Sequence, residues 1–271
     1  MQSSAQSLKI QVGPLGICYQ DLGTGGIPLI FIHGFPFDKS SWGEQLNSLY
    51  QAQRVIAYDV RGFCKSKPDD NKVSISLFAD DLVMLMDALH ISQSIVCGLS
   101  MGGYIALNAI SRYPDRFKAL VLADTQCAAD TEEAKEKRYK SIVQIQNEGL
   151  DDYANEFVEK IFCRKSREEK PEIVDSIRQT ILSTPVTTIT RTLSAIAQRT
   201  ETCSILDEIQ VPTLIICGEE DTVIPPEKSK YMHQRIRHSE LHIIKDAGHM
   251  SNMEQPQVFN RHLLNFIARL N

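Results

Sequence analysis

Short runs of consecutive apolar residues recur along the chain, and they are the first guide to its fold. Four of them are followed closely by a glycine, a histidine or an aspartate. These residues are His33-Gly34, Asp59, Gly98 and Asp124. Continuous apolar strands are typical of a parallel sheet that is covered by helices on both faces. The runs occupy residues 28–32, 54–58, 94–97, 119–122, 213–217 and 241–244.

The segments between these runs have the periodicity of helices. Ser76 is a candidate N-cap for one helix, and residues 101–112 form a second one that ends before Pro114. The apolar residues of the first helix share one face: Phe78, Leu82, Leu85, Met86 and Leu89. Residues 8–12 and 17–22 predict an antiparallel start, broken at 13–16. The pattern predicts an α/β fold with a mostly parallel, doubly wound sheet.

The alternation of strands and helices stops between residues 125 and 199. Apolar residues recur there at helical spacing, and strands return only after Pro212. We therefore predict one core domain, built from residues 1–124 and 200–271, and an all-helical insertion at 125–199. The insertion leaves the sheet at the carboxyl end of a strand, which is the edge where open α/β sheets bind ligands.

Composition narrows the class of protein. The chain has 271 residues, is 42% hydrophobic and 23% charged, and carries a net charge of −5 without a dense basic run. A nucleic-acid partner is therefore not expected, and no apolar stretch is long enough for a membrane span. Met1 to Ser7 lack the apolar segment of a signal peptide. A cytoplasmic protein is the expectation.

The seven cysteines are scattered and include no Cys-x-x-Cys pair. A chain of this length needs no disulfide framework, and no zinc-binding spacing is present. We expect buried, reduced thiols throughout, with Cys97 and Cys217 as small core residues. The set comprises Cys18, Cys64, Cys97, Cys127, Cys163, Cys203 and Cys217.

Ser100 is the first candidate for chemistry. It lies in Gly98-Leu99-Ser100-Met101-Gly102, directly after an apolar run and at the start of a predicted helix. A serine in this position occupies a sharp strand-to-helix turn, which raises its hydroxyl above the sheet. The alternative is a glycine-rich turn that holds an incidental serine.

A serine nucleophile needs a base, and the base needs an acid to orient it. His249 follows the last predicted strand and Asp221 follows the one before, so both should reach the edge that holds Ser100. Asp124 also ends a strand at this edge and is the alternative acid. For His249, the alternative is a loop histidine without a partner. The chain order Ser100, Asp221, His249 is the one expected for this kind of elbow.

Acyl transfer also needs hydrogen-bond donors for the oxyanion. The amide of Met101, next to the nucleophile, is one candidate. The amide of Phe35, in His33-Gly34-Phe35-Pro36, is the other. His33 itself is expected to hold this loop in place rather than to act as the base.

Together these motifs resemble the α/β-hydrolase superfamily. Within it the chain is similar to small carboxylesterases and to enzymes like 3-oxoadipate enol-lactonase. The resemblance implies an α/β-hydrolase fold in which the insertion is a cap over the active site. One departure is Cys64, which stands where the family often has glycine. We expect a local change in packing there rather than a reactive thiol.

The resulting functional prediction is a serine hydrolase that cleaves a small to medium carboxylic ester or lactone through an acyl-enzyme. It requires no metal and no organic cofactor. Phe35, Met101, Phe157 and Phe162 are the predicted substrate-binding residues. The same triad can serve a C–C bond hydrolase, a perhydrolase or an acyltransferase, and the fold can serve a small-molecule receptor with slow hydrolysis. The sequence does not indicate an oligomeric state.

Overall fold

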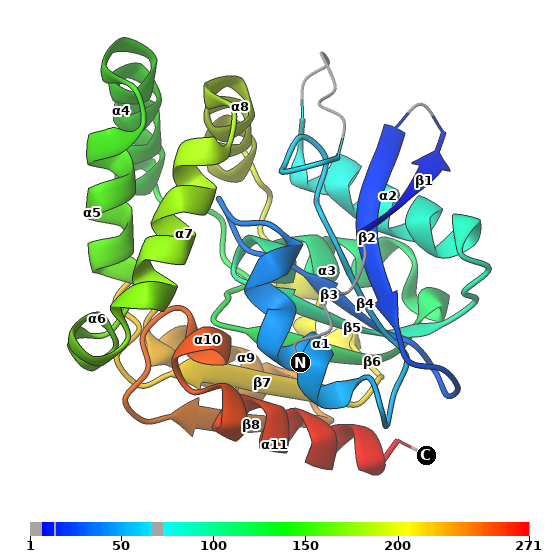
Figure 1. Cartoon of the computed structure of the whole chain (residues 1–271). Helices are drawn as coiled ribbons and strands as arrows, with labels where there is room; N and C mark the ends of the chain where they lie inside the picture. Colours follow the sequence, from blue (N-terminus) through cyan, green and yellow to red (C-terminus); the bar gives the residue numbers. More distant parts are fainter. Residues whose placement is uncertain (1–6, 14, 67–72, 271) are drawn as a thin grey trace.

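A single eight-stranded sheet organises the chain, and the computed structural model describes residues 7–13, 15–66 and 73–270 of it (Figure 1). The spatial order of the strands is β1-β2-β4-β3-β5-β6-β7-β8. Their bounds are β1 Leu8–Val12, β2 Leu15–Leu22, β3 Leu29–Ile32, β4 Val55–Tyr58, β5 Ser94–Leu99, β6 Phe117–Ala123, β7 Thr213–Gly218 and β8 Ser239–Ile244.

The sheet is parallel except at its start. β1 pairs with β2 and β2 with β4 in antiparallel register, whereas every pair from β4 to β8 is parallel. All residues of β3, β4, β5 and β7 are buried, as the continuous apolar runs predicted. The predicted fold class is confirmed. The predicted break at 13–16 is too long, because Leu15 and Gly16 already belong to β2; Pro14 lies outside the described residues.

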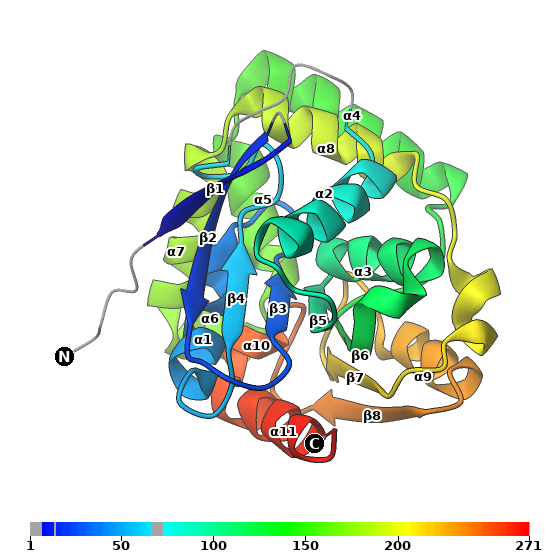
Figure 2. The same ribbon diagram turned by 90° about the vertical axis from the view of Figure 1, so that its right-hand side faces the viewer.

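Helices cover both faces of the sheet (Figure 2). One face carries α2 (Ile75–Ala88), α3 (Met101–Arg112) and α9 (Pro226–Arg235), and the other carries α1 (Gly43–Leu49) and α11 (Pro256–Ala268). Ser74, not Ser76, caps α2, because its hydroxyl oxygen accepts a hydrogen bond from the Leu77 amide. Among the described residues, no helix combines the length and the apolar character that a membrane crossing requires.

The insertion consists of helices, and it joins the carboxyl end of β6 to β7. Figure 1 shows α4, α5, α7 and α8 standing to one side of the sheet, with α6 at their foot. α4 packs mainly on α8, and α5 packs on α7. The bounds of these helices are α4 Glu132–Glu148, α5 Asp151–Ile161, α6 Arg164–Glu169, α7 Pro171–Ser183 and α8 Val186–Ala197.

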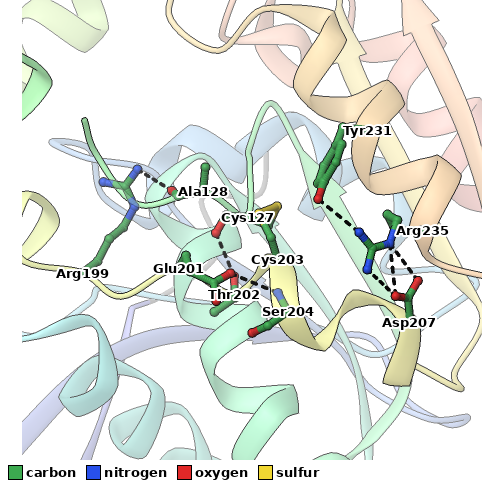
Figure 3. The surroundings of a disulfide bond; sticks show 10 residues. All are labelled: Cys127, Ala128, Arg199, Glu201, Thr202, Cys203, Ser204, Asp207, Tyr231 and Arg235. Carbon is green, nitrogen blue, oxygen red and sulfur yellow. Dashed lines mark hydrogen bonds and ion pairs between the residues drawn. A yellow bond between two sulfur atoms is a disulfide. The ribbon is translucent and has the colours of Figure 1, made fainter.

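A disulfide between Cys127 and Cys203 ties the two ends of the insertion together (Figure 3). The expectation that every cysteine is a reduced thiol is therefore wrong for this pair. The two residues are 76 positions apart, so their spacing carried no signal. The fold brings them together because the first and last residues of the insertion lie side by side. The Thr202 amide donates a hydrogen bond to the Cys127 carbonyl there, at 2.8 Å. Cys97 and Cys217 are fully buried, as predicted.

Candidate active site

Ser100 occupies the turn between β5 and α3 in a strained backbone conformation, with φ 52° and ψ −115°. Its amide donates to the Ala123 carbonyl, and its carbonyl accepts from the Thr125 hydroxyl, so neighbouring β6 holds the turn in place. A Cβ atom at Gly98 would collide with the Gly102 carbonyl. The glycines are therefore required by close packing of the strand against the helix.

His249 links Ser100 to Asp221. Its Nε2 lies 2.8 Å from Ser100 Oγ, and its Nδ1 lies 2.7 Å from Asp221 Oδ2. The three side chains come from loops after β5, β7 and β8, and all three residues are buried. The structure thus brings together the three residues that the sequence analysis selected, in the predicted order of contact.

The backbone fixes the orientation of the Asp221 carboxylate. Its Oδ1 accepts hydrogen bonds from the amides of Val223 at 2.8 Å and Ile224 at 2.9 Å. Only Oδ2 is left to face His249, so the carboxylate favours the tautomer with hydrogen on Nδ1. That tautomer leaves the Nε2 lone pair directed at the Ser100 hydroxyl.

The pKa of His249 reflects competing effects of its surroundings. Burial alone would lower the pKa, because it penalises the charged imidazolium. The negative charge and hydrogen bond of Asp221 act in the opposite direction, with smaller contributions from Asp124 and Glu254, and the net pKa is raised. The site therefore stabilises a protonated histidine, as a general base in acyl transfer requires.

Asp124, the alternative acid, has other partners. Its Oδ1 accepts from the Gly218 amide at 2.8 Å, and its Oδ2 lies 2.6 Å from the Ser251 hydroxyl. Burial, together with the charge of Asp221, raises the pKa of Asp124 well above its usual range. Asp124 thus connects the ends of β6 and β7 to the helix after His249. Of the two candidate acids, Asp221 is the one that is hydrogen-bonded to the imidazole.

The loop after β3 lies against the nucleophile. A Cβ atom on Gly34 would be 3.2 Å from Ser100 Cβ, which places Phe35 beside the serine. Within the described part of the chain, neither the Phe35 amide nor the Met101 amide has an acceptor in the protein. Both are thus available to an oxyanion, and their role stays a prediction.

His33 holds this loop, as expected. It accepts a hydrogen bond from the Val60 amide at Nε2, so its Nδ1 hydrogen is directed to the Gly34 carbonyl 2.8 Å away. Burial lowers the pKa of His33, which keeps the ring neutral in this bridging role.

The aromatic residues predicted to bind substrate lie in two different environments. Phe157, on α5, is half-buried, and its ring packs edge-on against Phe35 and Phe37 at centroid distances of 6.3 and 6.2 Å. Phe162, Phe35 and Met101 are all buried, and Phe162 has 3% of its surface exposed. The structure thus places Phe157 directly over the predicted oxyanion loop. Substrate contact by any of the four residues stays a prediction.

One cluster of potential metal ligands occurs among the described residues, formed by Asp38, Asp59 and Cys64. One of its three members, Asp59, is already paired with the ammonium group of Lys39, at 2.9 Å from Asp59 Oδ2. Partial burial and the carboxylates of Asp59 and Asp38 raise the pKa of the Cys64 thiol to about 12. The thiolate is scarce at neutral pH, which agrees with the expectation that Cys64 is unreactive.

Sequence reasoning missed Glu254. This residue is fully buried, yet its carboxylate accepts hydrogen bonds from the amides of Gly248 and Met250, on either side of His249. A glutamate ordinarily faces solvent, and only the tertiary contacts distinguish this one. The helix that carries it is α10 (Ser251–Glu254).

Comparison with known proteins agrees with this geometry. Residues 27–256 match the model of the α/β hydrolase fold family. The chain belongs to this family. It is 28% identical over 254 residues to 3-oxoadipate enol-lactonase 2 of Acinetobacter baylyi, covering 93% of each chain.

Two solved structures of this family are also similar along nearly their whole length. A thermophilic esterase from Thermogutta terrifontis has a TM-score of 0.93 and 33% identity, covering 98% of this chain and 99% of its own. The enol-lactonase from Burkholderia xenovorans LB400 has a TM-score of 0.90 and 25% identity, covering 96% and 100%. This α/β hydrolase thus has both esterases and lactonases among its relatives.

Proposed function

We propose that this α/β hydrolase is a serine hydrolase that cleaves small to medium carboxylic esters or lactones. The observation that carries the proposal is the position of His249, in hydrogen-bond distance of Ser100 on one side and Asp221 on the other. The names of the esterase and enol-lactonase relatives support the same substrate class.

The proposed mechanism has two steps. Ser100 Oγ attacks the carbonyl carbon while His249 Nε2 takes its proton, and Asp221 stabilises the imidazolium. The amides of Phe35 and Met101 bind the oxyanion. His249 then protonates the leaving alcohol, and a water molecule activated by the same histidine releases the acid from Ser100. In a lactone the first step opens the ring, so the new hydroxyl group stays on the acyl chain and the second step releases a single hydroxy acid.

The helical insertion is, in this proposal, a cap that selects the substrate. Binding pockets are mostly apolar with a few polar groups, and Phe157 supplies an aromatic surface next to the oxyanion loop. Phe35, Met101 and Phe162 complete the proposed contacts. The substrate is a small molecule, and the reaction uses the chain's own residues without a metal or organic cofactor.

Active-site labelling tests the proposal directly. A fluorophosphonate should label the wild-type protein at Ser100 only, and Ser100→Ala should lose at least about 10⁴-fold in kcat on p-nitrophenyl acetate. Labelling at another residue, or activity that survives the substitution, would reject Ser100 as the nucleophile. Circular dichroism confirms that the variant is folded.

A substrate panel separates the proposal from other uses of the triad. The turnover rate on esters and lactones should exceed that on a vinylogous diketone, which reports C–C bond hydrolysis. It should also exceed the rate of peracid formation in the presence of peroxide. Added alcohol should not divert the acyl group, as it would in an acyltransferase. A receptor would bind a ligand tightly while its turnover stays slow.

We also propose a cytoplasmic location, and the two bonded cysteines provide its test. Cytosolic thiols are kept reduced, so in a cytoplasmic protein the Cys127–Cys203 disulfide of the structure would be reduced to two thiols. Alkylation in rapidly acidified cells, followed by mass spectrometry, measures the oxidised fraction. A fully oxidised pair would argue for an oxidising compartment.

A further inference from the structure

The loop that carries His249 is hydrogen-bonded to one buried carboxylate, that of Glu254. Glu254 Oε1 accepts from the Gly248 amide at 2.7 Å and from the Met250 amide at 3.2 Å. Its Oε2 accepts from the amide of Cys163, in the turn between α5 and α6, at 2.9 Å. One side chain thus joins both neighbours of His249 to the helical insertion.

The same turn also contacts His249 itself. The His249 amide donates to the Ile161 carbonyl at 2.7 Å. A Cβ atom on Gly248 would lie 2.8 Å from the Cys163 nitrogen and 2.9 Å from the Ile161 oxygen, so the two backbones are in direct contact. The insertion therefore touches the backbone of the proposed base as well as covering the site.

The three amide donors of Gly248, Met250 and Cys163 require an acceptor group with two oxygens, which a carboxylate provides. No cationic side chain pairs with the Glu254 carboxylate among residues 7–13, 15–66 and 73–270, and the Lys170 ammonium contacts only its backbone carbonyl. Without the carboxylate, three buried amides would lose their partners, each at a cost of about 1–3 kcal/mol. The arrangement gives the loop one well-defined position.

We infer that Glu254 is a positioning residue that, together with the α5–α6 turn at Ile161–Cys163, clamps the His249 loop in its reactive place. The inference rests on the proposed role of His249 as the base. It extends the function of the cap, whose helices then support the catalytic geometry in addition to selecting the substrate.

The charge of Glu254 provides a readout that a purely structural role would not give. Three carboxyl groups act electrostatically on His249: Asp221 after β7, which is hydrogen-bonded to the ring, and, with smaller effects, Asp124 after β6 and Glu254 on α10. Burial lowers the pKa of His249, and these groups oppose that effect. Loss of one negative charge should therefore lower the pKa of the imidazole, whereas looser packing alone would hydrate the ring and raise its pKa.

The test compares Glu254→Gln with Lys165→Gln in the full-length protein. Glutamine keeps the shape but presents an NH₂ group to one of the amides, so it should misplace the loop. Lys165 is a matched control because its exposed ion pair with Asp246, at 2.9 Å, bridges the same two segments and contributes little to stability.

Two measurements are made on each variant. One is the pH profile of kcat and KM on p-nitrophenyl acetate, and the other is an NMR titration of the His249 ring. For Glu254→Gln we expect kcat to fall about 10- to 100-fold, since a shift near 1 Å can have this effect. KM should change less than about twofold, the pKa of His249 should fall, and Lys165→Gln should match the wild type.

Glu254→Asp is the second variant, used also if Glu254→Gln does not fold. It keeps the charge but withdraws the oxygens by one methylene group, so kcat should fall while the pKa of His249 stays near the wild-type value. A Glu254→Gln protein with wild-type kcat and an unchanged His249 titration would overturn the inference. The inference would also be overturned if a lower melting temperature were the only change in either variant.

Failure of the proposed function looks different from failure of this inference. If the wild type neither hydrolyses esters nor is labelled at Ser100, the proposed function is wrong. The His249 titration then still reports whether Glu254 sets the state of the imidazole.

Discussion

Asp221→Asn is the substitution whose outcome follows most directly from the geometry. The amides of Val223 and Ile224 donate to Asp221 Oδ1, so the asparagine must keep its carbonyl oxygen there. Its NH₂ group then faces His249 Nδ1, where the carboxylate oxygen stood at 2.7 Å. The amide donates, so Nδ1 must accept and the ring hydrogen must move to Nε2.

The flipped tautomer has no lone pair for the serine proton. We expect kcat to fall about 10⁴-fold, equivalent to about 5.5 kcal/mol of transition-state stabilisation. The pKa of His249 should fall as well, because the charge that raised it is gone. The assay is kcat/KM on p-nitrophenyl acetate between pH 5 and about pH 9, with circular dichroism as the check on folding.

Asp124→Asn is the matched control. Burial raises the pKa of Asp124, so its surroundings penalise a negative charge there, and asparagine is a neutral residue of the same shape. The asparagine carbonyl can accept from the Gly218 nitrogen, and its NH₂ group can donate to Ser251 Oγ once the serine hydroxyl, which donates to Asp124 Oδ2, rotates away. We expect a loss of less than about tenfold, and a larger loss than in Asp221→Asn would refute the assignment of the acid.

Other regions of the structure lead to further predictions. Gly102→Ala should abolish soluble expression or activity, because its Cβ would collide with the Ile32 carbonyl; a folded, active variant would show that the elbow can relax. Replacing Cys127 and Cys203 by serine should lower the free energy of unfolding by up to about 4 kcal/mol, from the 76-residue separation that the disulfide closes, and urea denaturation measures this loss. Phe157→Ala should change the preferred acyl length in kcat/KM across p-nitrophenyl esters; if stability falls while the preference stays fixed, the role of the cap in specificity is wrong.

Because the pKa of Asp124 is raised, we also expect the stability of the protein to depend on pH through this group. A carboxyl group whose pKa is higher in the folded state binds its proton more tightly there, so its contribution to stability is present below the unfolded pKa near 4 and is lost as pH rises towards the folded pKa. Asp124→Asn removes this dependence. As the pH rises above about 4, its melting temperature should therefore decline less than that of the wild type, and parallel curves would contradict the direction of the shift.

Local patterns in the chain were sufficient to predict the sheet and the position of Ser100. The apolar runs predicted the buried strands because a parallel sheet hides both faces, and this requirement acts on consecutive residues. Gly98 and Gly102 marked the elbow because the strand and helix that approach each other there are adjacent in the sequence. The order of Ser100, Asp221 and His249 followed from the same strand ends.

Contacts between distant segments could only be read from the folded chain. Asp124 and Asp221 both follow strands at the active edge, and the direction of each carboxylate, which depends on the partners it meets, separates them. Cys127 and Cys203 meet because the insertion returns to its starting point. Glu254 is buried because the α5–α6 turn covers it. The sequence pattern reports burial and local geometry, whereas partners that lie 76 to 94 positions apart are chosen only when the tertiary structure forms.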